Sequence, residues 1–196
     1  KKLPNFLSEI EIEDLLDIYD LNTYDGIRNR LILELLYATG MRDRELVNIK
    51  LKDIDSTEKY IKILGKGNKE RVVYFGDYAK EYLEIYLNNS RNYLLKNKSC
   101  DYLFINNIGT KLSTRGVELI VKKVIKDTSI KTNITPHTIR HTFATHLLNE
   151  GCDILSVQEL LGHESLRATQ VYTHITNEGL RNIYNNSHPR NNKSIK

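Results

Sequence analysis

An apolar helical run that ends abruptly at a glycine constrains this fold more than any other feature of the sequence. Residues 31–38 form a strongly apolar helical segment, which Thr39-Gly40 breaks. Asp43 can cap a second helix directly afterwards. Arg42 therefore lies at a helix-turn-helix corner, beside a helix start. Glu45 follows three residues later and can hold the Arg42 guanidinium in a bidentate pair.

Residues 136–150 indicate another helix with a well-defined start. Thr135 is a good N-cap and Pro136 suits the first helical position. The helix is predicted to end at Gly151. Its apolar side chains recur at helical spacing and are expected to face the core: Ile139, Phe143 and Leu147.

This spacing leaves His137, Arg140 and His141 on a different side of the helix. His137 and Arg140 lie one turn apart, near the positive end of the helix dipole. Backbone donors, the dipole and the guanidinium all favour a bound anion there. A single arginine at a helix start is as often structural as functional. Two of them, Arg42 and Arg140, in similar surroundings favour anion binding.

The middle of the chain has a strand-forming pattern and not a helical one. Residues 60–64 and 71–75 are rich in β-forming side chains and are separated by a glycine-rich turn at 65–70. This pattern predicts a hairpin with Lys66 and Lys69 at its tip. Strand signals are confined to about residues 54–75, and leucine-rich helical runs dominate elsewhere. The sequence therefore predicts a mainly α-helical fold with a small antiparallel β-sheet.

Charge is distributed unevenly along the chain. The net charge is only +4, from 29 basic and 25 acidic side chains. Residues 9–20 hold six acids and no base, whereas residues 110–131 hold six bases and two acids. A helix over about residues 114–126 would present several of these bases to solvent, where phosphates are natural partners. The alternative is an ordinary solvated helix face.

Several other classes of protein fit less well. Two isolated cysteines give no disulfide framework, and neither a signal peptide nor a membrane-spanning apolar run is present, which favours a cytoplasmic setting. His137 and His141 have the spacing of a zinc-binding helix, but no glutamate follows His137 as in metalloproteases. The hairpin turn lacks the Gly-Lys-Ser/Thr ending of a nucleotide-binding loop. We therefore predict no metal site, no membrane contact and no small-molecule substrate.

Four motifs together resemble the catalytic domain of tyrosine recombinases, in particular Xer-type recombinases and phage or transposon integrases. The resemblance covers nearly the whole chain, with the motifs in family order and at family-like spacing. The segments that carry it are Ala38-Thr39-Gly40-Met41-Arg42, Gly65-Lys66-Gly67-Asn68-Lys69-Glu70-Arg71, Thr135-Pro136-His137-Thr138-Ile139-Arg140-His141-Thr142-Phe143-Ala144-Thr145-His146, and Leu161-Gly162-His163 through to Tyr172.

The resemblance implies a role for each matching residue. Tyr172 matches the nucleophile that forms a 3′-phosphotyrosyl bond with DNA. Arg42 and Arg140 match the two arginines that clamp the scissile phosphate. Lys66 matches the hairpin lysine that protonates the leaving 5′ oxygen. This chemistry needs neither ATP nor a metal, so no cofactor is expected.

Three further positions complete the implied site. His137 matches the histidine of the His-x-x-Arg motif, and His163 matches a histidine that hydrogen-bonds the phosphate. Glu45 aligns with an acid that supports the first arginine. Arg44 departs from the pattern, because relatives usually carry a small residue there. Basic side chains on the hairpin and the basic helix are predicted to contact DNA: Lys69, Arg71, Arg115, Lys122, Lys123 and Lys126.

The resemblance also implies a domain organisation and partners. Residues 1–8 would be a linker remnant, 9–175 the catalytic domain, 176–187 a C-terminal helix and 188–196 a flexible tail, with the N-terminal core-binding domain absent. The partners would be double-stranded DNA, in a bacterial or archaeal nucleoid, and other protomers in a tetramer on paired sites. The C-terminal helix would dock on a neighbouring protomer in that assembly; the alternative is folding back onto its own chain.

Other interpretations remain open at the level of sequence. A type IB topoisomerase-like enzyme shares this chemistry but acts on one duplex, and a non-catalytic DNA-binding regulator could keep the fold without turnover. The chain has 12 tyrosines, and spacing alone does not choose Tyr172 over Tyr184 as nucleophile.

Overall fold

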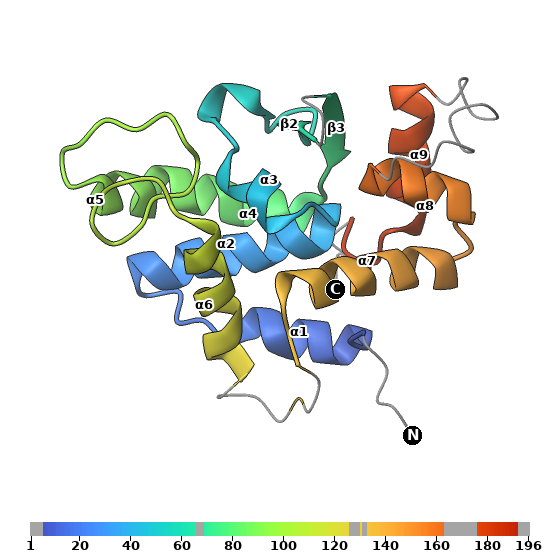
Figure 1. Ribbon diagram of the computed structural model, residues 1–196, viewed down its shortest axis with the longest axis horizontal. Helices are drawn as coiled ribbons and strands as arrows, with labels where there is room; N and C mark the ends of the chain where they lie inside the picture. The colour runs from blue at the N-terminus through green and yellow to red at the C-terminus, as the bar shows by residue number, and fades with distance from the viewer. Residues whose placement is uncertain (1–5, 66–68, 126–129, 131–132, 163–175, 192–196) are drawn as a thin grey trace.

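Helix α2 (Tyr24–Thr39) passes through the middle of the molecule, and most other elements pack around it (Figure 1). Every residue from Gly26 to Thr39 is buried, in agreement with the apolar run in the sequence. The Thr23 side chain accepts a hydrogen bond from the Gly26 N–H and caps the helix start. Gly40 ends the helix with φ of 60°, a left-handed conformation that favours glycine.

The computed structural model describes residues 6–65, 69–125, 130, 133–162 and 176–191. Its elements, in chain order, are α1 (Glu9–Asp17), α2, α3 (Asp43–Val47), η1 (Leu51–Asp53), β1 (Ile54–Asp55), β2 (Tyr60–Leu64), β3 (Glu70–Tyr74), α4 (Asp77–Ile85), η3 (Tyr86–Ser90), α5 (Arg91–Leu95), α6 (Thr114–Ile125), α7 (Pro136–Asn149), α8 (Ile154–Leu161) and α9 (Asn177–Ser187). The predicted fold class, mainly helical with a small antiparallel sheet, is confirmed.

The sheet has the order β1-β2-β3, and both pairs of strands are antiparallel. Ile61 on β2 lies opposite Val73 on β3, and both side chains are buried. Leu64 lies opposite Glu70, so the predicted hairpin forms with β3 starting one residue earlier than expected. The named strands fall within residues 54–75 as predicted, although isolated bridges pair Lys50 with Tyr102 and Ile105 with Lys111.

Helix α7 begins as the sequence predicts and joins two parts of the core. The Thr135 side chain accepts a hydrogen bond from Thr138 N, and Pro136 occupies the first turn. Ile139 belongs to the large cluster around α2. Phe143 and Leu147 belong to a second cluster with side chains of α8, α9 and β3. All three predicted core residues are buried, so α7 is fixed from both sides.

Helix α9 folds back onto its own chain in this structure. Leu180 and Tyr184 are buried in the second cluster, against α8 and β3 (Figure 1). The adjoining residues 188–191, which the sequence assigns to a flexible tail, are instead packed, with His188 and Asn191 buried. The physical reason is that their polar groups have partners. The Asn191 carbonyl accepts from the Asp77 N–H at 2.8 Å.

A buried polar network ties the two ends of the described chain to α2 and α7. The His146 Nε2–H donates to the Leu7 carbonyl at 2.8 Å, so Nδ1 accepts from the Tyr37 hydroxyl at 2.7 Å. His188 uses both ring nitrogens in the same way. Its Nε2–H donates to the Tyr37 carbonyl at 3.2 Å, and its Nδ1 accepts from the Arg190 N–H at 3.2 Å. The backbone N–H on Nδ1 requires His188 to be neutral, and burial lowers the pKa of His146 and so favours its neutral form as well.

Three further observations concern membrane spans, disulfides and metal-binding groups. Among the described residues, no helix combines the length and apolar character needed to cross a membrane. Cys100 and Cys152 are free thiols. No group of three or more histidine, cysteine or carboxylate side chains gathers in the part of the chain that the structure describes.

The buried histidines predict a loss of stability in mild acid. Burial lowers the pKa of His188 to about 3, with Arg190 and His146 adding in the same direction against the hydrogen bond to the Tyr37 carbonyl. Burial also lowers the pKa of His146. An unfolded imidazole titrates near 6.5, so below that pH the unfolded state binds the extra proton and stability falls. His188 alone should account for ~2 kcal/mol between pH 7 and pH 5.

Urea unfolding at the two pH values measures this loss. His188→Gln should flatten the dependence on pH, whereas His141→Gln should keep it because that side chain is exposed in the folded protein. An equal slope for all three proteins would show that His188 is not held neutral.

Candidate active site

Arg42 lies at the start of α3, where its backbone N–H and its guanidinium both contact the Glu45 carboxylate. Glu45 Oε2 accepts from the Arg42 backbone N–H at 2.7 Å, and Glu45 Oε1 lies 3.2 Å from Arg42 Nη1. Arg42 is thus the N-cap residue and Glu45 closes the capping box. The expectation that Asp43 caps this helix is wrong. Asp43 sits in the first turn and accepts from the Arg44 N–H at 2.8 Å.

Arg140 is a buried arginine, only 7% exposed, that joins the ends of two helices. Its Nη1 donates to the Gly40 carbonyl at 2.6 Å, just after α2. Its Nη2 donates to the Leu161 carbonyl at 2.9 Å, at the end of α8. Burial, with the positive charge of Arg42 acting in the same direction, lowers the pKa of Arg140 to about 10. The group therefore stays protonated at neutral pH.

Glu45 is the buried carboxylate between the cationic side chains. Its bidentate partner is Arg71, at 2.5 Å from Nη1 to Oε1 and 3.0 Å from Nη2 to Oε2. Burial raises the pKa of Glu45, but the hydrogen bonds and charge of Arg71, with a smaller contribution from Arg42, outweigh it and leave the pKa below its usual value. The bidentate pair expected from the spacing of Arg42 and Glu45 is therefore made by a different arginine.

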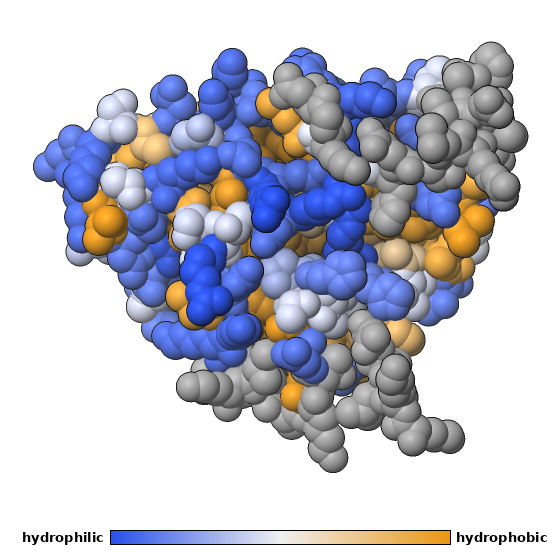
Figure 2. All heavy atoms as spheres, viewed as in Figure 1, coloured by the Kyte–Doolittle hydropathy of each residue, from blue (hydrophilic) through white to orange (hydrophobic). Residues whose placement is uncertain are grey.

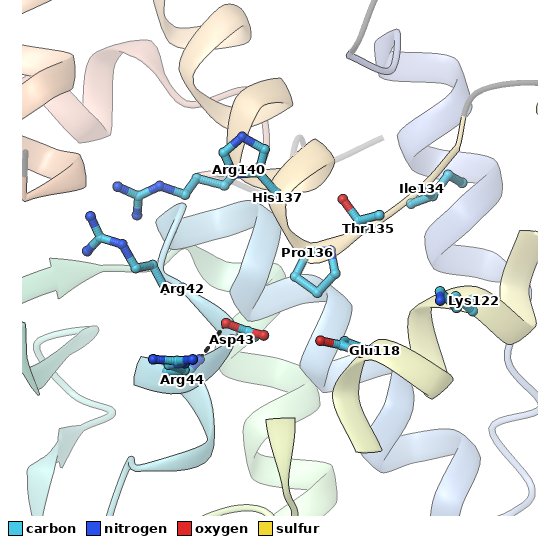
Figure 3. Close-up of a pocket in the computed structure, with 10 residues that line it drawn as sticks. All are labelled: Arg42, Asp43, Arg44, Glu118, Lys122, Ile134, Thr135, Pro136, His137 and Arg140. Atoms are coloured by element: carbon cyan, nitrogen blue, oxygen red, sulfur yellow. Dashed lines mark hydrogen bonds between the residues drawn. The ribbon is translucent and has the colours of Figure 1, made fainter. Parts of the chain in front are cut away.

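The two arginines of the motifs open onto one pocket of about 670 Å³ (Figure 3). Figure 3 shows the Arg42 and Arg140 side chains extending in the same direction, with the His137 ring beside them. Glu118 and Lys122 reach the pocket from α6 on its other side. The pocket is lined by Arg42, Asp43, Arg44, Glu118, Lys122, Ile134, Thr135, Pro136, His137 and Arg140. The molecule is hydrophilic over much of the face shown in Figure 2.

The structure brings together Arg42, Glu45, His137 and Arg140, which the sequence places up to about a hundred residues apart. His137 is exposed at the mouth of the pocket. Four predicted site residues lie outside the described residues, so the structure says nothing of them: Lys66, Lys126, His163 and Tyr172.

The predicted DNA contacts have differing surroundings. Lys69, Lys122 and Lys123 are exposed. Arg115 is exposed too, although its Nη1 lies 3.0 Å from Glu118 Oε2. Arg71 is different, because its side chain is only 16% exposed and its guanidinium is committed to Glu45. The sequence prediction missed this pairing, and the only available signal was the inward position of residue 71 in an alternating strand.

Tyr184, the rival nucleophile, is unsuited to that role. Its side chain is 1% exposed, and burial raises its pKa well above the usual value for a phenol. A buried phenol that resists ionisation cannot approach a DNA backbone. Tyr172, outside the described residues, stays a prediction.

Comparison with known proteins decides the family. Residues 5–178 match the model of a family described as the phage integrase family. The chain belongs to this family. It is 48% identical over 195 residues to the tyrosine recombinase XerC of Bacillus licheniformis, which covers 98% of this chain and 64% of that protein. The chain therefore spans slightly less than two thirds of the length of this curated relative.

Two solved recombinase structures have a similar fold. The crystal structure of XerA recombinase superposes with a TM-score of 0.74 at 35% identity, covering 97% of this chain and 67% of that one. The XerH site-specific recombinase bound to its difH substrate in a pre-cleavage complex superposes with a TM-score of 0.73 at 32% identity, covering 94% of this chain and 55% of that one. The small sheet beside a helical core is thus shared with recombinase structures.

Arg140 donates to the carbonyl of Gly40, and the packing around that glycine predicts that alanine costs more stability there than at Gly151. A Cβ on Gly40 would lie 2.5 Å from Phe143 Cδ1 and 2.7 Å from Leu161 Cδ2, and its φ is +60°. Gly151 also has a positive φ, +85°, but a Cβ there meets nothing within 4 Å. Gly40→Ala should therefore cost about 2–5 kcal/mol of unfolding free energy, from backbone strain and overpacking together.

Gly151→Ala is the matched control and should cost only the strain, about 1–2 kcal/mol. Urea unfolding at neutral pH measures both. Equal losses for the two variants would mean that the close packing around Gly40 relaxes without cost.

Proposed function

We propose that this protein is the catalytic part of a site-specific DNA recombinase, which cuts and rejoins DNA through a 3′-phosphotyrosyl intermediate. The observation that carries the proposal is the fixed pair of guanidiniums, Arg42 and Arg140, on one pocket. Arg140 donates to carbonyls at the ends of α2 and α8, and Arg42, at the start of α3, contacts Glu45 through one guanidinium nitrogen. Membership of the phage integrase family and similarity to proteins named tyrosine recombinase support the same reaction.

The two arginines suit a phosphoryl transition state. Negative charge spreads over the non-bridging oxygens, and donors fixed in advance on those oxygens are usually the largest contribution to catalysis. A planar guanidinium fork matches this geometry better than an ammonium group. By analogy with oxyanion-hole donors, the loss of either arginine should slow cleavage on the order of 10²- to 10³-fold.

The other predicted catalytic residues would act as nucleophile, base and acid in the making and breaking of bonds. The Tyr172 phenol would attack phosphorus and break the bond to the 5′ oxygen, with His137 as the nearby base that takes the phenolic proton. Lys66 would give its proton to the departing 5′ oxygen, and His163 would hydrogen-bond the phosphate. The phosphotyrosyl ester keeps the energy of the broken bond. A 5′ hydroxyl from a second strand can then reverse the attack and complete the exchange.

DNA is the partner that the charge distribution favours. Lys122 reaches the pocket from α6, and Lys123 and Arg115 are exposed on the same helix. With Lys69 on the hairpin and Lys126, they would neutralise backbone phosphates, which makes binding strongly dependent on salt. We infer that the natural setting is a bacterial or archaeal nucleoid, in the cytoplasm.

Strand exchange needs two paired sites, and we propose a tetramer as the active assembly. Helix α9 is the element suited to linking protomers, because its apolar face is centred on Leu180 and Tyr184 and its few polar contacts, such as Arg181 with Glu58, lie at the surface. The same face could dock on a neighbour once released from its own chain. The relatives named tyrosine recombinase favour strand exchange over topoisomerase-like relaxation of a single duplex.

The nucleophile is tested by trapping the covalent intermediate. A pool of nicked suicide duplexes with a randomised centre is incubated with the protein, and DNA-linked protein is captured on a denaturing gel and sequenced. The unaltered protein should form an adduct on one enriched sequence, and Tyr172→Phe should form none because it lacks the attacking oxygen.

Tyr184→Phe is the control, since the same atom is removed from a buried position. It should keep the adduct. An adduct from Tyr172→Phe would exclude Tyr172 as the nucleophile.

The general acid is tested with the duplex recovered from that pool. Lys66→Ala should slow cleavage on the order of 10²- to 10⁴-fold, because the 5′ alkoxide then leaves without a proton. A 5′-phosphorothiolate at the same position needs no proton and should restore the rate. Lys69→Ala, on the same hairpin, should show no such rescue, and normal cleavage by Lys66→Ala would refute the assignment.

A further inference from the structure

Arg71 contacts Glu45 from β3, an edge strand of the sheet. It lies on β3, opposite Ile63, with its side chain turned inward. Both of its Nη atoms donate to Glu45, one to each carboxylate oxygen. A two-point contact of this kind fixes the orientation of both groups.

The Arg71 side chain also packs against the end of α8. Gly162 caps that helix with φ of +64°, and a Cβ there would lie 2.8 Å from both Cδ and Nε of Arg71 and 2.9 Å from its Cζ. No side chain fits between them. In the sequence, Gly162 directly precedes His163.

A third contact reaches the hairpin. A Cβ on Gly65 would lie 3.3 Å from Arg71 Nη1, and the Gly65 N–H donates to the Lys69 carbonyl at 2.8 Å to close the end of the two strands. In the sequence, Gly65 directly precedes Lys66. The guanidinium of Arg71 therefore lies beside the last described residue before each of two predicted catalytic groups.

The contacts that Glu45 makes with Arg42 and Arg71 indicate how Arg71 affects Arg42. Glu45 faces Arg42 and Arg71, and Arg71 takes both of its oxygens at the shorter side-chain distances. Arg42 keeps one longer side-chain contact, at 3.2 Å, and its side chain is 40% exposed. Without the Arg71 fork, Glu45 would keep its bond to the Arg42 N–H and would be free to draw the Arg42 guanidinium into a closer pair. Arg42 would then be drawn away from a phosphate in the pocket.

We propose that Arg71 is a positioning residue, which occupies Glu45 so that the guanidinium of Arg42 is left available to the scissile phosphate. It is not a DNA contact. This inference rests on the proposed function and adds to it a residue that acts through Glu45 and Arg42. Arg71 is thus a requirement for the rate of cleavage and not for DNA affinity.

The test compares DNA binding with cleavage at saturating DNA, using the duplex recovered from the suicide pool. Arg71→Gln should keep the Kd and its dependence on salt, and should slow adduct formation on the order of 10- to 10²-fold. Lys122→Gln is the matched comparison for a phosphate contact, and its salt slope should fall by about 1. A 5′-phosphorothiolate should not rescue Arg71→Gln, because the defect lies in phosphate stabilisation and not in proton donation.

A second variant separates positioning from a purely structural defect. Adding Glu45→Gln to Arg71→Gln removes the charge that captures Arg42, so the double variant should cleave faster than Arg71→Gln alone. If Arg71→Gln does not fold, as judged by circular dichroism, Arg71→Lys is used in both comparisons, since it keeps the charge but lacks the fork.

Each contrary result has a definite meaning. A salt slope that falls by about 1 with an unchanged rate would make Arg71 a DNA contact and overturn the inference. Rescue by phosphorothiolate, or a double variant no faster than the single one, would also overturn it. Absence of an adduct with the unaltered protein would instead refute the proposed function, so the two failures are distinguishable.

Discussion

The hydrogen bonds of the Arg140 guanidinium to two helix ends hold the site together. A buried guanidinium must have its donors satisfied, and here the acceptors are the carbonyls of Gly40 and Leu161. Helix C-termini carry partial negative charge, so two such ends are suitable partners for a cation. Both helices end in a left-handed glycine, Gly40 and Gly162. These turns let α2 and α8 stop close to the same side chain.

One buried carboxylate, Glu45, interacts with all three arginines of the site. Glu45 lies among Arg42, Arg71 and Arg140 and affects all three, directly or through space. A cluster of cations alone would repel itself, and the buried Glu45 offsets part of that repulsion. One buried acid, shared unequally between two arginines, stabilises the arrangement and still leaves positive charge facing the pocket. This is the electrostatic setting that a phosphodiester requires.

Residues 188–191, the last that the structure describes, are part of the same body. Arg190 donates to Glu34, which is buried in α2, with its Nη2 2.7 Å from Oε1, and its guanidinium lies 3.9 Å from the centre of the Tyr78 ring. His188 inserts beside Tyr37 of α2 and Phe143 of α7. Because α7 also carries Arg140, the segment after α9 packs on the helix that supports the site. Release of α9 toward a neighbour would therefore disturb this packing.

The sequence by itself determined the local structure. Gly40 ends α2, Thr135 and Pro136 start α7, and the alternating residues around the glycine-rich turn form a hairpin, because each depends on the backbone preferences of a few adjacent residues. Tertiary structure decided the rest. Arg71 and Glu45 are 26 residues apart, and Arg190 and Glu34 are 156 apart. Which charge meets which in the interior depends on how the helices pack, so an arginine expected on the surface became the partner of a buried acid, and a polar tail became part of the core.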